Sequence, residues 1–184
     1  LVLRYLKKCN LIINMAIDVK SWVEAFRLRT LPLSLSCILM GTFLAADQGF
    51  FRSDVFFLAI STTILLQVLS NLANDYGDSI HGADSVDRKG PSRAVQKGSI
   101  SKSEMKKAII IFSVLAFVSG ISLLYITFKE QMIYLLIFLG IGLVSIFAAI
   151  NYTAGSKPYG YRGLGDLAVL IFFGFVGVGG TYFL

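Results

Sequence analysis

An all-α, multi-span transmembrane helix bundle is the fold that this sequence predicts, and three observations support it. Hydrophobic residues make up 55% of the chain and charged residues only 15%. A mean hydropathy of +0.73 is more than the core of a soluble domain needs. Apolar runs of about 20 residues, the length that crosses the hydrocarbon of a bilayer, recur along the chain. The charged residues gather between these runs.

Five windows qualify as membrane spans, with approximate edges. In chain order they are 31–47, 54–73, 108–128, 132–151 and 164–184. The first window is short and begins at Leu31-Pro32.

Basic residues predict how the bundle is oriented, because loops rich in Lys and Arg stay on the cytoplasmic side. Segment 1–30 and the loops 74–107 and 152–163 carry most of them, whereas the two opposite connections carry only Arg52 and Lys129. We therefore expect an integral protein of the inner (plasma) membrane, with the N-terminus and both basic loops in the cytoplasm. This topology explains most of the net charge of +6, and we expect no nucleic-acid partner.

Amides and carboxylates form a polar stripe near the end of the second window. The spacing i, i+3, i+4, i+7 places them on one helix face: Asn71, Asn74, Asp75 and Asp78. Gln67 extends the stripe one turn deeper. Polar groups at membrane depth usually face a bundle interior or a wet cavity. Two close carboxylates at a helix C-terminus predict a bound cation, and oxygen ligands without His or Cys favour Mg²⁺ or Ca²⁺.

Further charges of both signs follow the stripe. They are Asp84, Asp87, Arg88, Lys89, Arg93 and Lys97. Carboxylates followed by fixed cations suit a phosphate ligand that is bridged by a metal ion. The alternative is a solvated loop whose charges only anchor the topology. Asn71 and Asn74 weigh against that alternative, because anchoring does not require amides inside a span.

A second candidate segment is "YTAGSKPYGYRGLGD" at 152–166. It combines glycines with the cations Lys157 and Arg162 and with three tyrosines, of which Tyr152 is the first. Because it is predicted on the same side as the aspartate loop, both segments can cover one cavity. The alternative is a structured turn in which Asp166 caps the fifth span rather than binding a ligand.

Two long motifs resemble a known family. The segment "NLANDYGDSIHGADSVDRKGPSRAVQKGSI" resembles the first aspartate-rich motif of the UbiA-type intramembrane prenyltransferases, in the version of those that act on 1,4-dihydroxy-2-naphthoate. The segments "YTAGSKPYGYRGLGDLAVLIFFG" and "FRLRTLPLSLSCILMG" fit the same family. The resemblance covers residues 20 to 184, with the motifs in the family's order.

The resemblance implies a bundle of about nine spans around a central cavity. Residues 31–184 would be the N-terminal part of that domain, in truncated form, after a cytoplasmic segment 1–30. Residues 1–14 would not be native if Met15 is the start. The resemblance also implies Mg²⁺ as cofactor and membrane lipid as surroundings. Polyprenyl diphosphate would be the donor, and 1,4-dihydroxy-2-naphthoate the acceptor that loses its carboxylate to give demethylmenaquinol in menaquinone biosynthesis.

The family's site residues carry over to matching positions of this chain. Asp75, Asp78 and Asp84 would hold the metal ion, and Asp75, Asp78 and Lys157 would be catalytic. The residues expected to bind the substrates are Asn71, Asn74, Arg93, Lys97, Tyr152 and Arg162.

One departure from the family is the missing second aspartate-rich motif, since only Glu130 and Asp166 are acidic after position 107. We therefore expect a fragment that is inactive by itself. Three alternatives stay open: a sister prenyltransferase that acts on another aromatic ring such as 4-hydroxybenzoate, a cation-binding membrane transporter, and a short protein that has lost its activity. The "GLGD" loop speaks against the first, and the basic run after the aspartates against the second.

Overall fold

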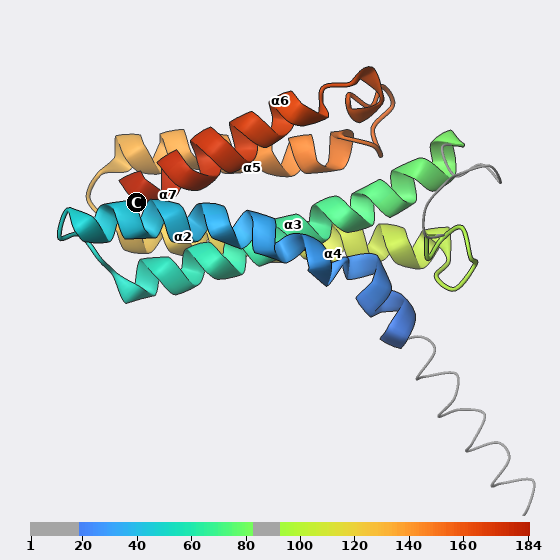
Figure 1. Ribbon diagram of the computed structural model, residues 1–184, viewed down its shortest axis with the longest axis horizontal. Helices are drawn as coiled ribbons and strands as arrows, with labels where there is room; N and C mark the ends of the chain where they lie inside the picture. The colour runs from blue at the N-terminus through green and yellow to red at the C-terminus, as the bar shows by residue number, and fades with distance from the viewer. Residues whose placement is uncertain (1–18, 83–92) are drawn as a thin grey trace, which may run out of the picture.

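The computed structural model of the chain describes residues 19–82 and 93–184, which form a bundle of helices without any strand in this part (Figure 1). Five helices in it are long and apolar enough to cross a membrane. They are Val19–Asp47, Ser53–His81, Lys102–Thr127, Met132–Asn151 and Gly165–Phe183. The predicted all-α, multi-span fold is confirmed. Asp84, one of the expected metal ligands, lies outside the described residues.

The first span is longer than predicted and is broken near its start. Residues 19–26 are helical, and after the break come the 3₁₀ turn η1 (Leu28–Thr30) and helix α2 (Leu31–Asp47). The break lies at Arg27, whose φ of 50° is in the left-handed region that side chains other than glycine rarely adopt. Pro32 is tolerated in the first turn of α2, where its missing N–H costs no helical hydrogen bond.

The second span, helix α3 (Ser53–His81), continues well past the predicted end at 73. It ends where Gly82 adopts a φ of 71°, a left-handed conformation that suits glycine after a helix. The whole polar stripe is therefore helical, and Asp78 lies in the last turn of α3. The predicted span ended too early because polar residues lower the mean hydropathy without breaking the helix.

The third and fourth spans form helices α4 (Lys102–Thr127) and α5 (Met132–Asn151). A capping box begins α4: the Ser101 hydroxyl accepts from the backbone N–H of Glu104, and the Glu104 carboxylate accepts from the backbone N–H of Ser101. This cap sets the start six residues before the predicted edge at 108. The bounds of α5 match the predicted window.

The fifth span consists of α6 (Gly165–Val169), the π-helical segment η3 (Leu170–Gly180) and α7 (Thr181–Phe183). It packs closely on α2, because a Cβ added at Gly41 would lie 2.5 Å from the carbonyl oxygen of Val178. Asp166 is not the cap that one reading of the sequence favoured. Leu164 is the N-cap, and Asp166 lies in the first turn of α6, where its negative charge interacts favourably with the helix dipole.

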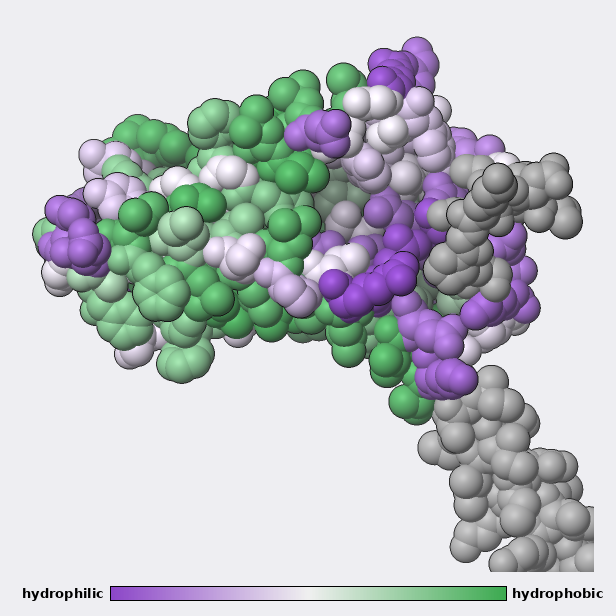
Figure 2. Space-filling model, in the orientation of Figure 1, coloured by the Kyte–Doolittle hydropathy of each residue, from purple (hydrophilic) through white to green (hydrophobic). Residues whose placement is uncertain are grey.

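The bundle has one strongly polar end and an apolar belt (Figure 2). Large apolar side chains are exposed along the belt, among them Phe57, Phe147 and Phe175 at 64–69% of their surface. Such exposure suits contact with lipid. The N-terminal helix, residues 93–101 and the segment that follows α5 lie at the same end of the bundle (Figure 1). The described parts of the three basic segments are therefore at one end.

Candidate functional site

The polar stripe of α3 is divided between two sectors of the helix surface. At about 100° of rotation per residue, Asn74 and Asp78 lie in one sector. Asn71 and Asp75 lie about 60° further around the helix axis. The two pairs consequently meet different parts of the protein, although the sequence spacing placed all four on one face.

Asn71 faces the break in the first span. Its side-chain N–H₂ donates to the carbonyl oxygen of Phe26 at 2.8 Å and to the hydroxyl oxygen of Thr30 at 2.9 Å. The Thr30 hydroxyl in turn donates to the carbonyl of Arg27 at 2.9 Å. Asn71 is 3% exposed. This buried amide therefore holds the N-terminal helix against α3, and its N–H groups are used within the protein.

Asp75 faces the short turn that follows the undescribed part of the loop. Its carboxylate accepts from the backbone N–H groups of Ala94 at 3.2 Å and Val95 at 3.4 Å. Only 1% of Asp75 is exposed. A buried carboxylate is costly unless donors compensate it, and backbone N–H groups do so here. Asp75 thereby fixes the turn that carries Arg93.

Asp78 is the centre of the other sector. Its carboxylate forms an ion pair with the Arg93 guanidinium and accepts a short hydrogen bond from the Tyr161 hydroxyl. The same guanidinium donates to the backbone carbonyl of Asn74 at 2.6 Å. Asp78 is 3% exposed. The structure thus joins Asp78 of α3, Arg93 of the first loop and Tyr161 of the second.

The loop after α5 is anchored on α3 beside this carboxylate. The Thr153 hydroxyl donates to the side-chain oxygen of Asn74 at 2.8 Å, and a ring nitrogen of His81 lies 2.9 Å from the carbonyl oxygen of Gly155. A Cβ added at Gly77 would lie 2.4 Å from the backbone carbon and oxygen of Thr153. Glycine at this position therefore lets the loop approach the helix backbone.

Arg93 is a largely buried cation, with 12% of its side chain exposed, and its pKa is perturbed. Desolvation by burial, with repulsion from the nearby cation of Arg27, lowers the pKa of Arg93 to about 10. The guanidinium still carries its charge near neutral pH. Arg93 and Arg27 therefore form a concentrated positive field near Asp78, as the binding of a phosphate group requires.

The remaining predicted cations lie at the surface. Lys97 pairs with Glu24 of the N-terminal helix at 3.1 Å, and both side chains are partly exposed. Lys157 and Arg162 are exposed, and neither side chain forms a hydrogen bond or ion pair with another described residue. Tyr152 packs edge-on against Tyr159, with ring centroids 5.2 Å apart. Burial raises the pKa of Tyr159, whose hydroxyl donates to the carbonyl of Ala148.

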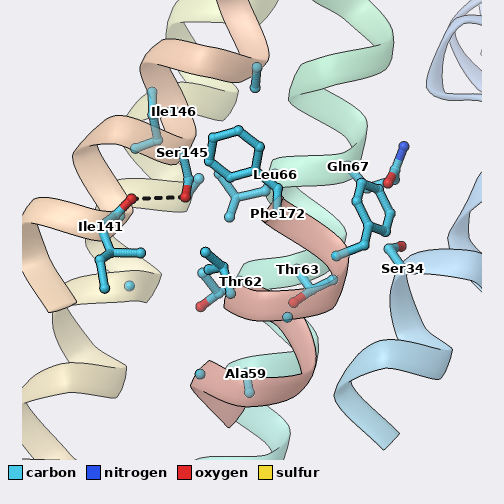
Figure 3. A pocket seen from close by; sticks show the side chains of 18 of the residues that line it. Ser34, Ala59, Thr62, Thr63, Leu66, Gln67, Ile141, Ser145, Ile146 and Phe172 are labelled. Atoms are coloured by element: carbon cyan, nitrogen blue, oxygen red, sulfur yellow. Dashed lines mark hydrogen bonds between the residues drawn. The ribbon is translucent and has the colours of Figure 1, made fainter. Parts of the chain in front are cut away.

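A cavity of about 350 Å³ lies within the bundle, and all five spans contribute to its lining. Figure 3 shows part of the lining, with Thr62, Thr63 and Gln67 among the labelled side chains. Tyr152 and Tyr159 line it as well. None of the described residues around the cavity is charged, so it suits an apolar or neutral ligand. Ser70 of the lining lies one helical turn from Asn74 and about two turns from Asp78.

Asn74 and Asp78 offer side-chain oxygens as possible ligands of a metal ion. In the described part of the chain, no group of three or more His, Cys, Asp or Glu residues comes together. Asn74 and Asp78 present oxygens in the same sector, and the guanidinium on Asp78 already stands where a cation is attracted. The donor chemistry of these two residues fits a divalent ion such as Mg²⁺. Both oxygens of Asp75 are engaged by backbone N–H groups.

Sequence reasoning missed two residues that build the site. They are Tyr161, one of the three tyrosines of the segment 152–166, and Gly77 of α3. The signal for Gly77 was present, because a glycine in a helix between two polar side chains often marks a close approach of another backbone. No sequence signal pairs Tyr161 with Asp78, since 83 positions separate them.

The protein is a helical integral membrane protein that contains a largely buried carboxylate–guanidinium pair and an uncharged cavity within the bundle. The sequence profile of the UbiA prenyltransferase family matches residues 34–184, so the chain belongs to this family.

Curated relatives agree with this membership. The chain is similar to the 1,4-dihydroxy-2-naphthoate octaprenyltransferase of Haemophilus influenzae, with 51% identity over 90% of this chain and 54% of the relative. The protein of the same name from Escherichia coli is 49% identical over 90% of this chain and 53% of its own length. That from Mycobacterium tuberculosis is 35% identical over 88% and 53%. The chain spans about half the length of these relatives. No solved structure matches it significantly.

Proposed function

We propose that the protein transfers a polyprenyl group from polyprenyl diphosphate to 1,4-dihydroxy-2-naphthoate. In this reaction the allylic C–O bond breaks, a C–C bond to the ring forms, and the carboxylate leaves as CO₂ to give demethylmenaquinol. The observation that carries the proposal is the arrangement of Asp78, Arg93 and Tyr161 near an uncharged cavity. The choice of acceptor is supported by two relatives that are 49–51% identical to this chain and whose names include 1,4-dihydroxy-2-naphthoate.

The residues of this chain have separate roles in the proposal. Arg93 and the exposed cations Lys157 and Arg162 bind the diphosphate and stabilise the charge that develops on it as it leaves. Lys97 supports the same positive surface, and Tyr152 forms part of the wall next to the reacting carbon. The uncharged lining excludes water, which would otherwise capture the allylic cation. The apolar surfaces of the Phe- and Leu-rich spans accommodate the prenyl chain.

Mg²⁺ is the cofactor that we propose, since prenyltransferases of this family generally depend on a metal ion. Asp78 and the side-chain oxygen of Asn74 would hold it, with Asp84 from the loop as a further candidate. When bound, the ion would neutralise charge on the diphosphate. We assign Asp75 to the edge of this site, because its carboxylate lies in the other sector of α3 and faces the turn at 94–95.

The proposal also includes the side of the membrane on which the site lies and the activity of the 184-residue chain by itself. We place the site at the cytoplasmic face of the inner membrane, because the polar end of the bundle carries the basic segments. We also propose that the 184-residue chain by itself has no activity. The relatives are about twice as long, so about half of each matched protein has no counterpart in this chain.

The function is tested with membranes that contain the protein produced from its complete gene. Labelled polyprenyl diphosphate is supplied with either 1,4-dihydroxy-2-naphthoate or 4-hydroxybenzoate, with and without Mg²⁺. We expect prenylated product and released CO₂ only with the naphthoate and the metal ion. Product from 4-hydroxybenzoate alone would favour the sister activity. Cation flux into proteoliposomes without any prenylated product would favour a transporter.

Lys157→Ala is expected to reduce kcat/KM for prenyl diphosphate by about 10-fold or more, whereas Lys129→Ala leaves it within about 2-fold. Both lysines are exposed, but Lys157 lies on the loop anchored beside Asp78 and Lys129 lies at the opposite end of the bundle. Initial rates at saturating acceptor, with varied prenyl diphosphate, give the comparison. Equal effects of the two substitutions would remove Lys157 from the site.

A further inference from the structure

A second row of polar side chains continues from Asp78 into the cavity. Thr63, Gln67 and Ser70 lie in the same sector of α3 as Asn74 and Asp78, because the five positions are spaced by four, three, four and four residues. All three line the cavity, and Figure 3 labels Thr63 and Gln67 there. The row is distinct from Asn71 and Asp75, whose side chains bond to other segments of the protein.

Thr63, Gln67 and Ser70 differ in their hydrogen bonding from several other polar side chains of the spans. The Thr62 and Ser119 hydroxyls bond to each other at 2.8 Å, and the hydroxyls of Ser61 and Ser145 donate to backbone carbonyls of their own helices. By contrast, the side chains of Thr63, Gln67 and Ser70 form no hydrogen bond with any described residue. A primary amide at membrane depth is costly without a partner.

The chemistry of the cavity selects the kind of group that can supply this partner. Since no charged residue is among the described lining, the interior does not favour an anion. A hydrocarbon chain has no polar atom to offer to Gln67. A neutral hydroxyl on a flat apolar ring satisfies both conditions, because the ring fills the apolar volume and the hydroxyl bonds to the amide.

The position of Gln67 along α3 agrees with an aromatic hydroxyl as its partner. Gln67 is seven residues from Asn74, about 10 Å along the helix axis. A ring that reacts next to the diphosphate must lie between these two levels. The carboxylate of such a ring then lies toward the polar end of α3, and its far side points toward Gln67.

We propose that Gln67, flanked by Thr63 and Ser70, binds the hydroxyl of the aromatic acceptor that is distal to the carboxylate, and so determines acceptor specificity. The inference rests on the proposed function and deepens it. Gln67 accepts from or donates to that hydroxyl and does not take part in bond breaking. The prenyl diphosphate is held elsewhere, by Arg93 and the loop cations.

The test compares Gln67→Leu with the wild type in the protein produced from its complete gene. We expect the KM for 1,4-dihydroxy-2-naphthoate to rise by about 3- to 10-fold, as the loss of one net hydrogen bond predicts. The KM for prenyl diphosphate should change by less than about 2-fold. Gln48→Leu is the matched control, since Gln48 is exposed at the opposite end of the bundle.

An inhibitor pair makes the assignment specific. 1-Hydroxy-2-naphthoate lacks the distal hydroxyl and should bind the wild type more weakly than 1,4-dihydroxy-2-naphthoate does, measured as competition for the acceptor site. In Gln67→Leu the two ligands should bind equally, which is the sign of a direct interaction in a double-mutant cycle. A difference between the ligands that persists in the variant overturns the inference. Absence of naphthoate turnover in the wild type contradicts the proposed function instead.

Discussion

Asp78→Asn is expected to lower turnover by at least about 100-fold while the protein still inserts into the membrane. The substitution keeps the size of the side chain and removes the negative charge. Asp78 accepts from Arg93 and Tyr161, and it is the described carboxylate best placed to attract a metal ion. An amide offers one acceptor oxygen and an N–H₂ group that repels the guanidinium and any cation.

The measurement is the initial rate of prenyl transfer in membranes with equal amounts of protein, over a series of Mg²⁺ concentrations. Asp47→Asn is the matched control, because Asp47 is exposed at the end of α2 far from the site. The control should retain the wild-type rate. If Asp78→Asn retains its rate and its dependence on Mg²⁺, Asp78 is not a metal ligand and the site must be assigned to other residues.

The sequence predicted the helical bundle well, because hydrophobic length alone identifies a span. It located the bounds of α5, whose flanks are polar and whose interior is uniformly apolar. The end of α3 was placed too early, since the same polar residues that build the site lower the hydropathy of its last two turns. The start of α4 was available from the sequence, because "SKSE" at 101–104 is a capping box.

The sequence predicted which residues of α3 belong to the candidate site, but not which neighbours their side chains contact. Spacing placed Asn71 and Asp75 together with Asn74 and Asp78, since a helical face of about 100° is wide enough for all four. Which neighbour each side chain meets depends on the packing of other segments. The N-terminal helix contacts Asn71 and the turn at 94–95 contacts Asp75, and neither contact follows from the sequence of α3.

The contact between α3 and the second loop leads to a prediction about a glycine. Gly77→Ala is expected to reduce turnover by about 10-fold or more, although the substitution adds only one methyl group. The new Cβ would lie 2.4 Å from the backbone of Thr153 and 2.7 Å from the backbone nitrogen of Ala154. Backbone atoms cannot rotate away as a side chain can, so the loop must move off the helix.

Displacement of this loop would separate the residues that form the site. Thr153 would lose its bond to Asn74, and Tyr161 would move away from Asp78, so the proposed metal ligands would lose partners and the loop cations would change position. An error of about 1 Å in such groups is enough to cost about 100-fold in rate. Overpacking would also destabilise the fold by about 1–3 kcal/mol, which leaves the apolar spans able to insert.

Gly140→Ala provides the matched control for this prediction. A Cβ at Gly140 meets no atom within 4 Å, and alanine is the better helix former by about 1 kcal/mol. This variant should keep its activity and unfold at the same or a higher temperature. Gly77→Ala should combine normal membrane levels with a large loss of rate and a weaker response to Mg²⁺. If Gly77→Ala and Gly140→Ala are equally active, the loop does not need to touch α3, and the contact between Tyr161 and Asp78 is not required for catalysis.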